Sequence, residues 1–336
     1  LRWASKEFFG CPAFERVIFY DEAGSSKLLI RKKDVLKSAN AVFKQTISNP
    51  EWAEELNNLV IDTASCAFSY FKQFPKDFSS CSNKELCEWF DESTLIRGDC
   101  QHVGTSWLAL DFSPEPIFVN YLTNYLSKRC EKSPAAAYAL LSTPLQKSKS
   151  QEEELSFAFL AKKIQGDEKA LKAFTSKSFS LNAFKLENPR LYAIFKKHVE
   201  EYRWLPFMYE GPAWTEEYFA KTLSSMLQTG TNVNALLKNV ILKAFELEEK
   251  QEKLLKEFKV DAFHDRLFDI SRNTVFGRGF RKDAIYHAFY KLQPLYAEIQ
   301  RRLKLDREDF LYLYQWEVPA LIEGTAQLGP MSRTMK

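Results

Sequence analysis

The chain has 336 residues, of which 45% are hydrophobic and 27% are charged, a composition typical of a folded globular protein and not of a disordered one. Its 47 basic and 44 acidic side chains leave a net charge of +3, which is too small for a nucleic-acid binder that works by bulk charge. Only 11 residues are glycine, which argues against glycine-rich phosphate loops and favours helices. No apolar run reaches roughly 18 residues, so we expect no membrane-spanning segment.

The cysteines are scattered along the first half of the chain: Cys11, Cys66, Cys81, Cys87, Cys100 and Cys130. None forms a Cys-x-x-Cys pair, so the sequence gives little support for a zinc site. Scattered cysteines in a chain of this length are typical of reduced thiols. The N-terminus carries no apolar signal core, and together these features predict a cytoplasmic protein.

The first predicted element is a β-hairpin near the N-terminus. Two short runs rich in β-formers, residues 16–20 and 27–30, flank a polar turn at 21–26. No other segment carries a convincing strand pattern. The sequence therefore predicts a mainly α fold, a multi-helix bundle with one small β-hairpin.

Helix-start signals follow along the chain. Asn49 and Asn188 each precede a proline, which combines an N-cap residue with proline at the first helical position. Thr215 is a third expected N-cap, with Trp214 before it placed to pack on Phe219 as a hydrophobic staple. Apolar spacing predicts two long helices over 235–258 and 282–303.

A polar stretch at 143–150 is the best candidate for a linker. We therefore divide the chain into an N-terminal part, 1–137, with the hairpin and helices, and a helical domain, 138–336.

The histidines are the first side chains to consider for chemistry. His198 follows Phe195 on an apolar helix stripe, which favours a packed, hydrogen-bonded core histidine. The alternative is a metal centre in a helix bundle, because Glu201 lies three residues after His198, and Asp261 lies three residues before His264. Asp283 and His287 form a further pair at helical spacing.

The densest basic cluster beside aromatic residues contains Arg278, Arg281 and Lys282, next to Phe276 and Phe280. Two interpretations stay open: solvated charges in a loop before a helix, or a contact with phosphate or an acidic partner. The chain contains no P-loop, no dinucleotide-binding glycine motif and no nucleophile elbow. From the residues alone we therefore assign no catalytic group.

Several strings over about 138–325 resemble the central helical region of phosphoenolpyruvate synthase-like proteins, which are phosphotransferases that use phosphoenolpyruvate. In chain order they are Leu140-Leu141-Ser142-Thr143-Pro144 with Ser148, Glu152 and Glu154; His198-Val199-Glu200-Glu201-Tyr202-Arg203-Trp204-Leu205; Tyr209-Glu210-Gly211-Pro212-Ala213-Trp214-Thr215-Glu216-Glu217-Tyr218-Phe219; Arg281-Lys282; Glu298-Ile299-Gln300-Arg301-Arg302-Leu303; Asp309-Phe310-Leu311-Tyr312-Leu313; and Trp316-Glu317-Val318. The candidate motif or interaction residues on these strings are His198, Trp204, Trp214, Arg281, Lys282 and Glu298.

The resemblance implies a parent kinase-like transferase in which an ATP-grasp domain precedes this region and a swivelling phosphohistidine domain follows it. ATP and Mg²⁺ are the cofactors expected for that parent, and none is expected in this chain. The chain lacks glycine-rich nucleotide-binding strands and a loop for the phosphohistidine, so no catalytic residue carries over. The resemblance therefore implies a non-catalytic helical scaffold. The alternatives are a stand-alone helical adaptor for a protein partner and a helix-bundle metalloenzyme.

Overall fold

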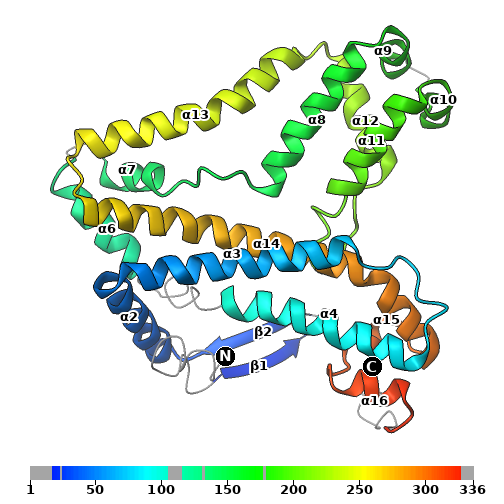
Figure 1. The fold of residues 1–336 in the computed structure, drawn as a ribbon, viewed down its shortest axis with the longest axis horizontal. Helices are drawn as coiled ribbons and strands as arrows, with labels where there is room; N and C mark the ends of the chain where they lie inside the picture. Colours follow the sequence, from blue (N-terminus) through cyan, green and yellow to red (C-terminus); the bar gives the residue numbers. More distant parts are fainter. Residues whose placement is uncertain (1–16, 23–24, 105–115, 131–132, 177–178, 327–336) are drawn as a thin grey trace.

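A computed structural model describes residues 17–22, 25–104, 116–130, 133–176 and 179–326 (Figure 1). These residues form fourteen helices and one antiparallel pair of strands. The predicted mainly α fold with a single small hairpin is therefore confirmed. Of the helices described, none combines the length and the apolar character needed to cross a bilayer.

The hairpin consists of β1 (Val17–Glu22) and β2 (Ser25–Ile30), with Val17 paired to Ile30 at its open end. Helix α2 (Lys32–Ser48) follows almost directly. Asn49 then ends α2 and caps α3 (Pro50–Lys72), because its side chain accepts a hydrogen bond from the backbone N–H of Trp52. The start signal read at Asn49 is confirmed.

The longest helix, α14 (Ala262–Leu303), has 42 residues and lies alongside α3 and α4 (Asn83–Gly104) (Figure 1). The sequence predicted a loop around Gly277 and a helix only from 282, which is wrong. Gly277 packs against α3, where an added Cβ would lie 3.4 Å from Cγ1 of Val60. The missing side chain lets the two helix backbones approach closely, and this packing compensates the weak helix propensity of glycine.

Two apolar clusters join α14 to the rest of the chain. The first contains side chains of α3, α4, the second half of α14, α15 (Arg307–Leu311) and α16 (Glu317–Ile322). The second contains side chains of α2, α3, α6 (Ile117–Ser127), α7 (Pro134–Leu141) and the start of α14. Both clusters combine residues from before and after 137, and the division at that point stays a prediction.

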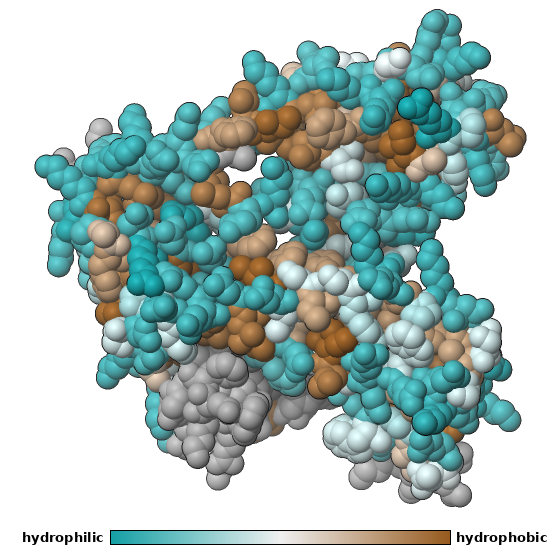
Figure 2. Space-filling view, viewed as in Figure 1, coloured by the Kyte–Doolittle hydropathy of each residue, from teal (hydrophilic) through white to brown (hydrophobic). Residues whose placement is uncertain are grey.

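A third apolar cluster forms a separate lobe above α3 and α14 (Figure 1). Its helices are α8 (Lys149–Gln165), α9 (Glu168–Thr175), α10 (Leu181–Glu187), α11 (Pro189–Tyr202), α12 (Glu216–Gln228) and the start of α13 (Val233–Glu257). Helix α13 leads from this lobe back to the start of α14. The space-filling view shows the molecule hollowed between the lobe and the α3–α14 layer (Figure 2).

The caps of this lobe follow the local signals. Thr215 accepts a hydrogen bond from the backbone N–H of Tyr218, as predicted for an N-cap. Helix α11 starts at Pro189, also as predicted, but the Asn188 side chain makes no capping bond. Ser148 caps α8 in a reciprocal arrangement with Gln151.

Candidate functional site

His198 lies inside the lobe and is 4% exposed. Its Nδ1 is 2.9 Å from Oγ of Ser156, and Oε1 of Glu153 lies 3.2 Å from Nε2 but off the direction of a hydrogen bond. The imidazole packs against the rings of Phe157 and Phe219. The prediction of a packed, hydrogen-bonded histidine is confirmed.

The alternative metal centre is not assembled. Asp261 caps α14, and its carboxylate accepts hydrogen bonds from Nδ1 of His264 at 2.9 Å and from the hydroxyl of Tyr125 at 2.7 Å. Asp261 and His264 lie at the start of α14, on the opposite side of the molecule from α11, which carries His198 and Glu201 (Figure 1). Among the residues described, no group of three or more His, Cys, Asp or Glu side chains is arranged to hold a metal ion.

The predicted basic cluster separates into a buried and an exposed part. Arg281 lies in the middle of α14, buried, and donates from Nη1 to the backbone carbonyl of Gln101 at 3.3 Å. It fills the space beside Gly104, where a Cβ would overlap its side chain. Burial lowers the pKa of the Arg281 guanidinium. Lys282 is exposed and Arg278 is half-buried, and both lie within α14 and not in the loop expected from the sequence.

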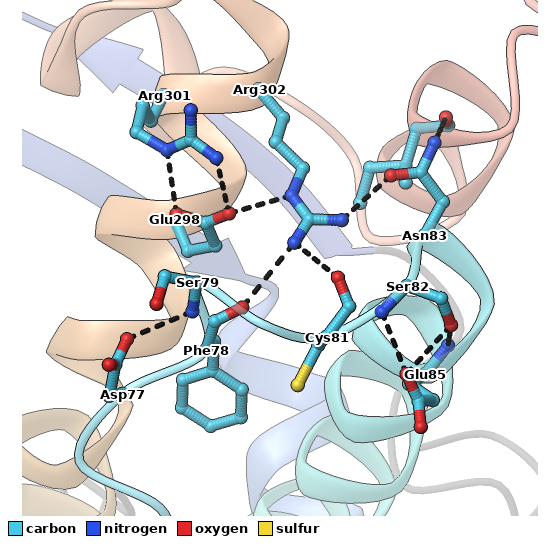
Figure 3. Close-up of polar contacts among 11 residues, drawn as sticks. Asp77, Phe78, Ser79, Cys81, Ser82, Asn83, Glu85, Glu298, Arg301 and Arg302 are labelled. Atoms are coloured by element: carbon cyan, nitrogen blue, oxygen red, sulfur yellow. Dashed lines mark hydrogen bonds and ion pairs between the residues drawn. The ribbon is translucent and has the colours of Figure 1, made fainter.

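Glu298 is a buried carboxylate at the centre of an ion-pair network (Figure 3). Its carboxylate accepts hydrogen bonds of 2.7–2.8 Å from Arg301 and one of 2.7 Å from Nε of Arg302, and these partners lower its pKa to about 2. Arg302 also donates to the backbone carbonyl of Cys81 at 2.6 Å and to Oδ1 of Asn83 at 2.8 Å. Glu298 therefore holds the connection between α3 and α4 against α14.

Trp214 packs as the sequence predicted. Its ring lies 5.5 Å from that of Phe219 in an edge-to-face arrangement, and it stacks on Tyr218 at 4.9 Å. The aromatic residue before the N-cap therefore does contact the residue one turn into α12, as a hydrophobic staple does.

We expect Trp214→Ala to lower the free energy of unfolding by about 2–3 kcal/mol, because a half-buried indole and its aromatic contacts are lost. Urea denaturation measures the change. Trp316→Ala is the matched control, since that indole is 72% exposed and its loss is expected to change stability by less than about 0.5 kcal/mol. An unchanged midpoint for Trp214→Ala would contradict the staple.

Trp204 lies beside a cavity. The indole is buried, donates from Nε1 to the backbone carbonyl of Glu201 at 2.7 Å, and lies edge-to-face with the ring of His287 at 5.2 Å. It lines a cavity of about 320 Å³ that opens between α3, α8, α14 and the end of α11. Of the other residues singled out from the sequence, Glu201, Phe280 and His287 also line it.

One wall of this cavity is aromatic. The Phe68 ring lies 5.2 Å from the rings of Phe280 and His287 and 5.8 Å from that of Trp204. Nζ of Lys149 is 5.3 Å from the centre of the Phe68 ring, a cation–π distance. The wall therefore consists of packed aromatic rings with the ammonium of Lys149 over the rings of Phe68 and Phe280.

The other wall is charged. Lys72, Lys149 and Lys291 reach it from three helices, and Glu200 and Glu201 lie at its border on α11. Both glutamates are exposed, whereas burial lowers the pKa of Lys291. The lining therefore carries one more positive than negative charge, with the ammonium of Lys291 partly removed from water.

His287 is the least exposed polar residue of the cavity, at 7%, and its Nδ1 has no hydrogen-bond partner within the described part of the chain. Burial, followed by repulsion from Lys291, Lys149 and Lys72, lowers its pKa to about 3. The imidazole is therefore neutral at physiological pH. Asp283, which the sequence paired with it, instead accepts a hydrogen bond from the backbone N–H of Lys149.

Sequence reasoning missed most of the cavity. Its residues on α3, from Ser65 to Lys72, recur at helical spacing, and Phe280, His287 and Lys291 share one face of α14. The signal present was a polar histidine and a lysine one turn apart on a face that is otherwise apolar. That signal indicates which face of α14 lines a cavity, but it does not indicate which helices lie opposite that face.

The chain matches no protein-family model, no curated protein and no solved structure. The likeness to phosphoenolpyruvate synthase-like proteins therefore stays a hypothesis that depends on the strings quoted above.

Proposed function

We propose that this chain is a non-catalytic helical scaffold module of a phosphoenolpyruvate synthase-like phosphotransferase, against which an ATP-grasp domain and a phosphohistidine domain are positioned. ATP and Mg²⁺ would be bound by those domains and not by this chain. The observation that carries the proposal is α14, a single 42-residue helix that contributes to two of the three apolar clusters and lines the cavity below the third. A single helix of this length fixes the relative positions of distant parts of a protein.

The motif residues support a structural role. His198, Trp204, Arg281 and Glu298 are all buried, and each contacts groups of its own chain. A catalytic set would instead converge on one open site. The free thiols among the described cysteines are consistent with a place in the reducing cytoplasm, which we include in the proposal.

The test is phosphoryl transfer by the complete parent protein carrying His198→Gln. We expect turnover to be nearly unchanged and the melting temperature to fall modestly, because glutamine retains a hydrogen-bonding group beside Ser156. This chain alone, incubated with γ-labelled ATP and Mg²⁺, is expected to acquire no label. Loss of turnover at an unchanged melting temperature, or labelling of the chain alone, would overturn the non-catalytic assignment.

The second candidate is a stand-alone helical adaptor. Tyr314 and Trp316 stack at 4.5 Å near the C-terminal helices while being 61% and 72% exposed, and exposed stacked aromatics are typical of protein contacts. The reading frame on either side of the chain distinguishes the two functions. A nucleotide-binding domain before it and a phosphohistidine domain after it would support the scaffold. A reading frame that encodes neither of these domains would favour the adaptor.

A further inference from the structure

Helix α13 bridges two of the apolar clusters and is held to the molecule along its inner face. Near its start Leu237 belongs to the cluster of the lobe, and near its end Leu254 packs against the cluster around the start of α14. Between them the buried side chain of Gln251 donates hydrogen bonds of 2.8 Å to the backbone carbonyls of Leu140 and Thr143. The contacts of α13 with its own chain therefore use one face of the helix.

The outer face of α13 carries large apolar side chains. Ile241, Leu242 and Phe245 are exposed, the ring of Phe245 by 61%, and none of them joins an apolar cluster of the described residues. Leu242 and Gln251 are nine residues apart, so Leu242 lies half a helix circumference away from the buried face. A surface helix normally carries polar side chains there. Because α13 lies at the edge of the molecule, this apolar face is open to another molecule (Figure 1).

Charged residues flank the apolar side chains in an order that complements itself. Lys238, Leu242, Phe245 and Glu249 recur at intervals of four, three and four residues, so they form one stripe along α13. Lys238 precedes Leu242 by as many positions as Glu249 follows Phe245. In the described part of the chain neither of these two charges forms an ion pair, whereas other glutamates of α13 pair with lysines one turn further on.

A second copy of the stripe supplies what the first one lacks. When two copies of α13 lie antiparallel about a two-fold axis midway along the stripe, Leu242 of one copy faces Phe245 of the other. The same register brings Lys238 of each copy level with Glu249 of the other. Two ion pairs then close the ends of the apolar contact, and both unpaired charges gain a partner from one symmetric arrangement. A parallel arrangement in register would instead place like charges together.

We propose that the stripe of α13 is a homodimer interface, in which it packs antiparallel against its own copy. This inference is independent of the scaffold function, since it concerns only the association of this chain with itself. A contact on one face of one helix is smaller than the roughly 800 Å² per partner of a standard stable interface. We therefore expect a weak, reversible dimer with a dissociation constant of roughly 100 µM.

The experiment is sedimentation equilibrium of the full chain at pH 7.5 over a series of concentrations. Phe245→Ser is expected to weaken the dimer at least tenfold, because the ring lies at the centre of the contact. Its near-ultraviolet circular dichroism and melting temperature are expected to stay unchanged, since the ring is exposed in the monomer. A chain that stays monomeric up to about 500 µM would overturn the second copy as the occupant of the stripe. A dimer that folded Phe245→Ser does not weaken would overturn the stripe as the interface.

Charge reversals test the antiparallel register. Lys238→Glu and Glu249→Lys are each expected to weaken the dimer at least threefold, because like charges then face each other across the contact. The double variant is expected to recover the affinity of the wild type. Lys243→Glu is the matched control, because this exposed lysine of α13 lies about 100° around the helix from Leu242, off the stripe, and the affinity is expected to stay unchanged. Failure of the double variant to recover, or an equal loss in Lys243→Glu, would overturn the pairing of Lys238 with Glu249.

Discussion

Glu298→Ala is expected to lower the free energy of unfolding by about 3 kcal/mol, because it leaves the buried guanidinium of Arg302 without its carboxylate. Glu298 is 7% exposed, and its two carboxylate oxygens accept two hydrogen bonds from Arg301 and one from Arg302. Arg302 also donates a hydrogen bond to the backbone carbonyl of Cys81. If its side chain loses its fixed position, the connection between α3 and α4 is no longer bound to α14. The loss is measured by urea denaturation at pH 7.

Two further variants distinguish the loss of the Glu298–Arg302 interaction from a general effect of removing a negative charge. Glu298→Gln keeps one acceptor oxygen and is expected to lose less than Glu298→Ala. Glu252→Ala removes an exposed carboxylate that pairs with Lys256 on α13, and its expected effect is below about 0.5 kcal/mol. Equal losses for Glu298→Ala and Glu252→Ala would show that the Arg302 network adds nothing to stability.

The pH dependence of this network has a defined sign. The pKa of Glu298 falls from 4.5 to about 2 on folding, so its contribution is fully present above pH 4.5 and is lost as the pH falls toward 2. The difference in stability between the wild type and Glu298→Gln is therefore expected to be constant above pH 5.

Local signals predicted the helix starts at Pro50, Pro189 and Glu216. The caps at Asn49 and Thr215 depend on residues within one turn of each other, so the sequence contains the whole interaction. The continuation of α14 through Gly277 depends on a distant contact instead. Gly277 is tolerated in mid-helix because Val60, more than two hundred positions earlier in the chain, packs against it.

The candidate site could be predicted only in part from the sequence, because its contacts also join residues that are far apart in the chain. The apolar stripe around His198 predicted its burial, but its partner Ser156 lies on another helix. The cavity requires Phe68, Lys149 and His287 to meet from three helices, and no spacing within any one helix specifies that meeting. Pattern predicts which face of a helix is buried, whereas the group opposite it is set by the packing of the whole chain.

His287→Phe is expected to change stability in a pH-dependent way. The pKa of His287 is about 6.5 in the unfolded chain and about 3 in the folded protein, because the ring is buried and faces Lys291, Lys149 and Lys72. The neutral ring therefore contributes stability that is fully present above pH 6.5 and is lost as the pH falls toward 3. Between pH 7 and pH 4.5 this loss is about 3 kcal/mol.

The wild-type curve alone does not reveal this loss, because Asp283 opposes it. Burial raises the pKa of Asp283 from 3.8 to about 6, so ionisation of Asp283 destabilises the fold above pH 6 and this penalty fades as the pH falls toward 3.8. Over the same interval the fading penalty of Asp283 therefore offsets part of what His287 loses. Glu200 and Glu201, which border the cavity from α11, are exposed and screened.

The measurement is therefore a difference. Urea denaturation of the wild type and His287→Phe at pH 7 and pH 4.5 is expected to show that the variant gains about 3 kcal/mol relative to the wild type on acidification. Asp283→Asn is the reciprocal control, since it is expected to be more stable than the wild type at pH 7 and to lose that advantage at pH 4.5. A stability difference between His287→Phe and the wild type that stays constant over this range would mean that His287 does not protonate on unfolding, and the buried, neutral state of the ring would be refuted.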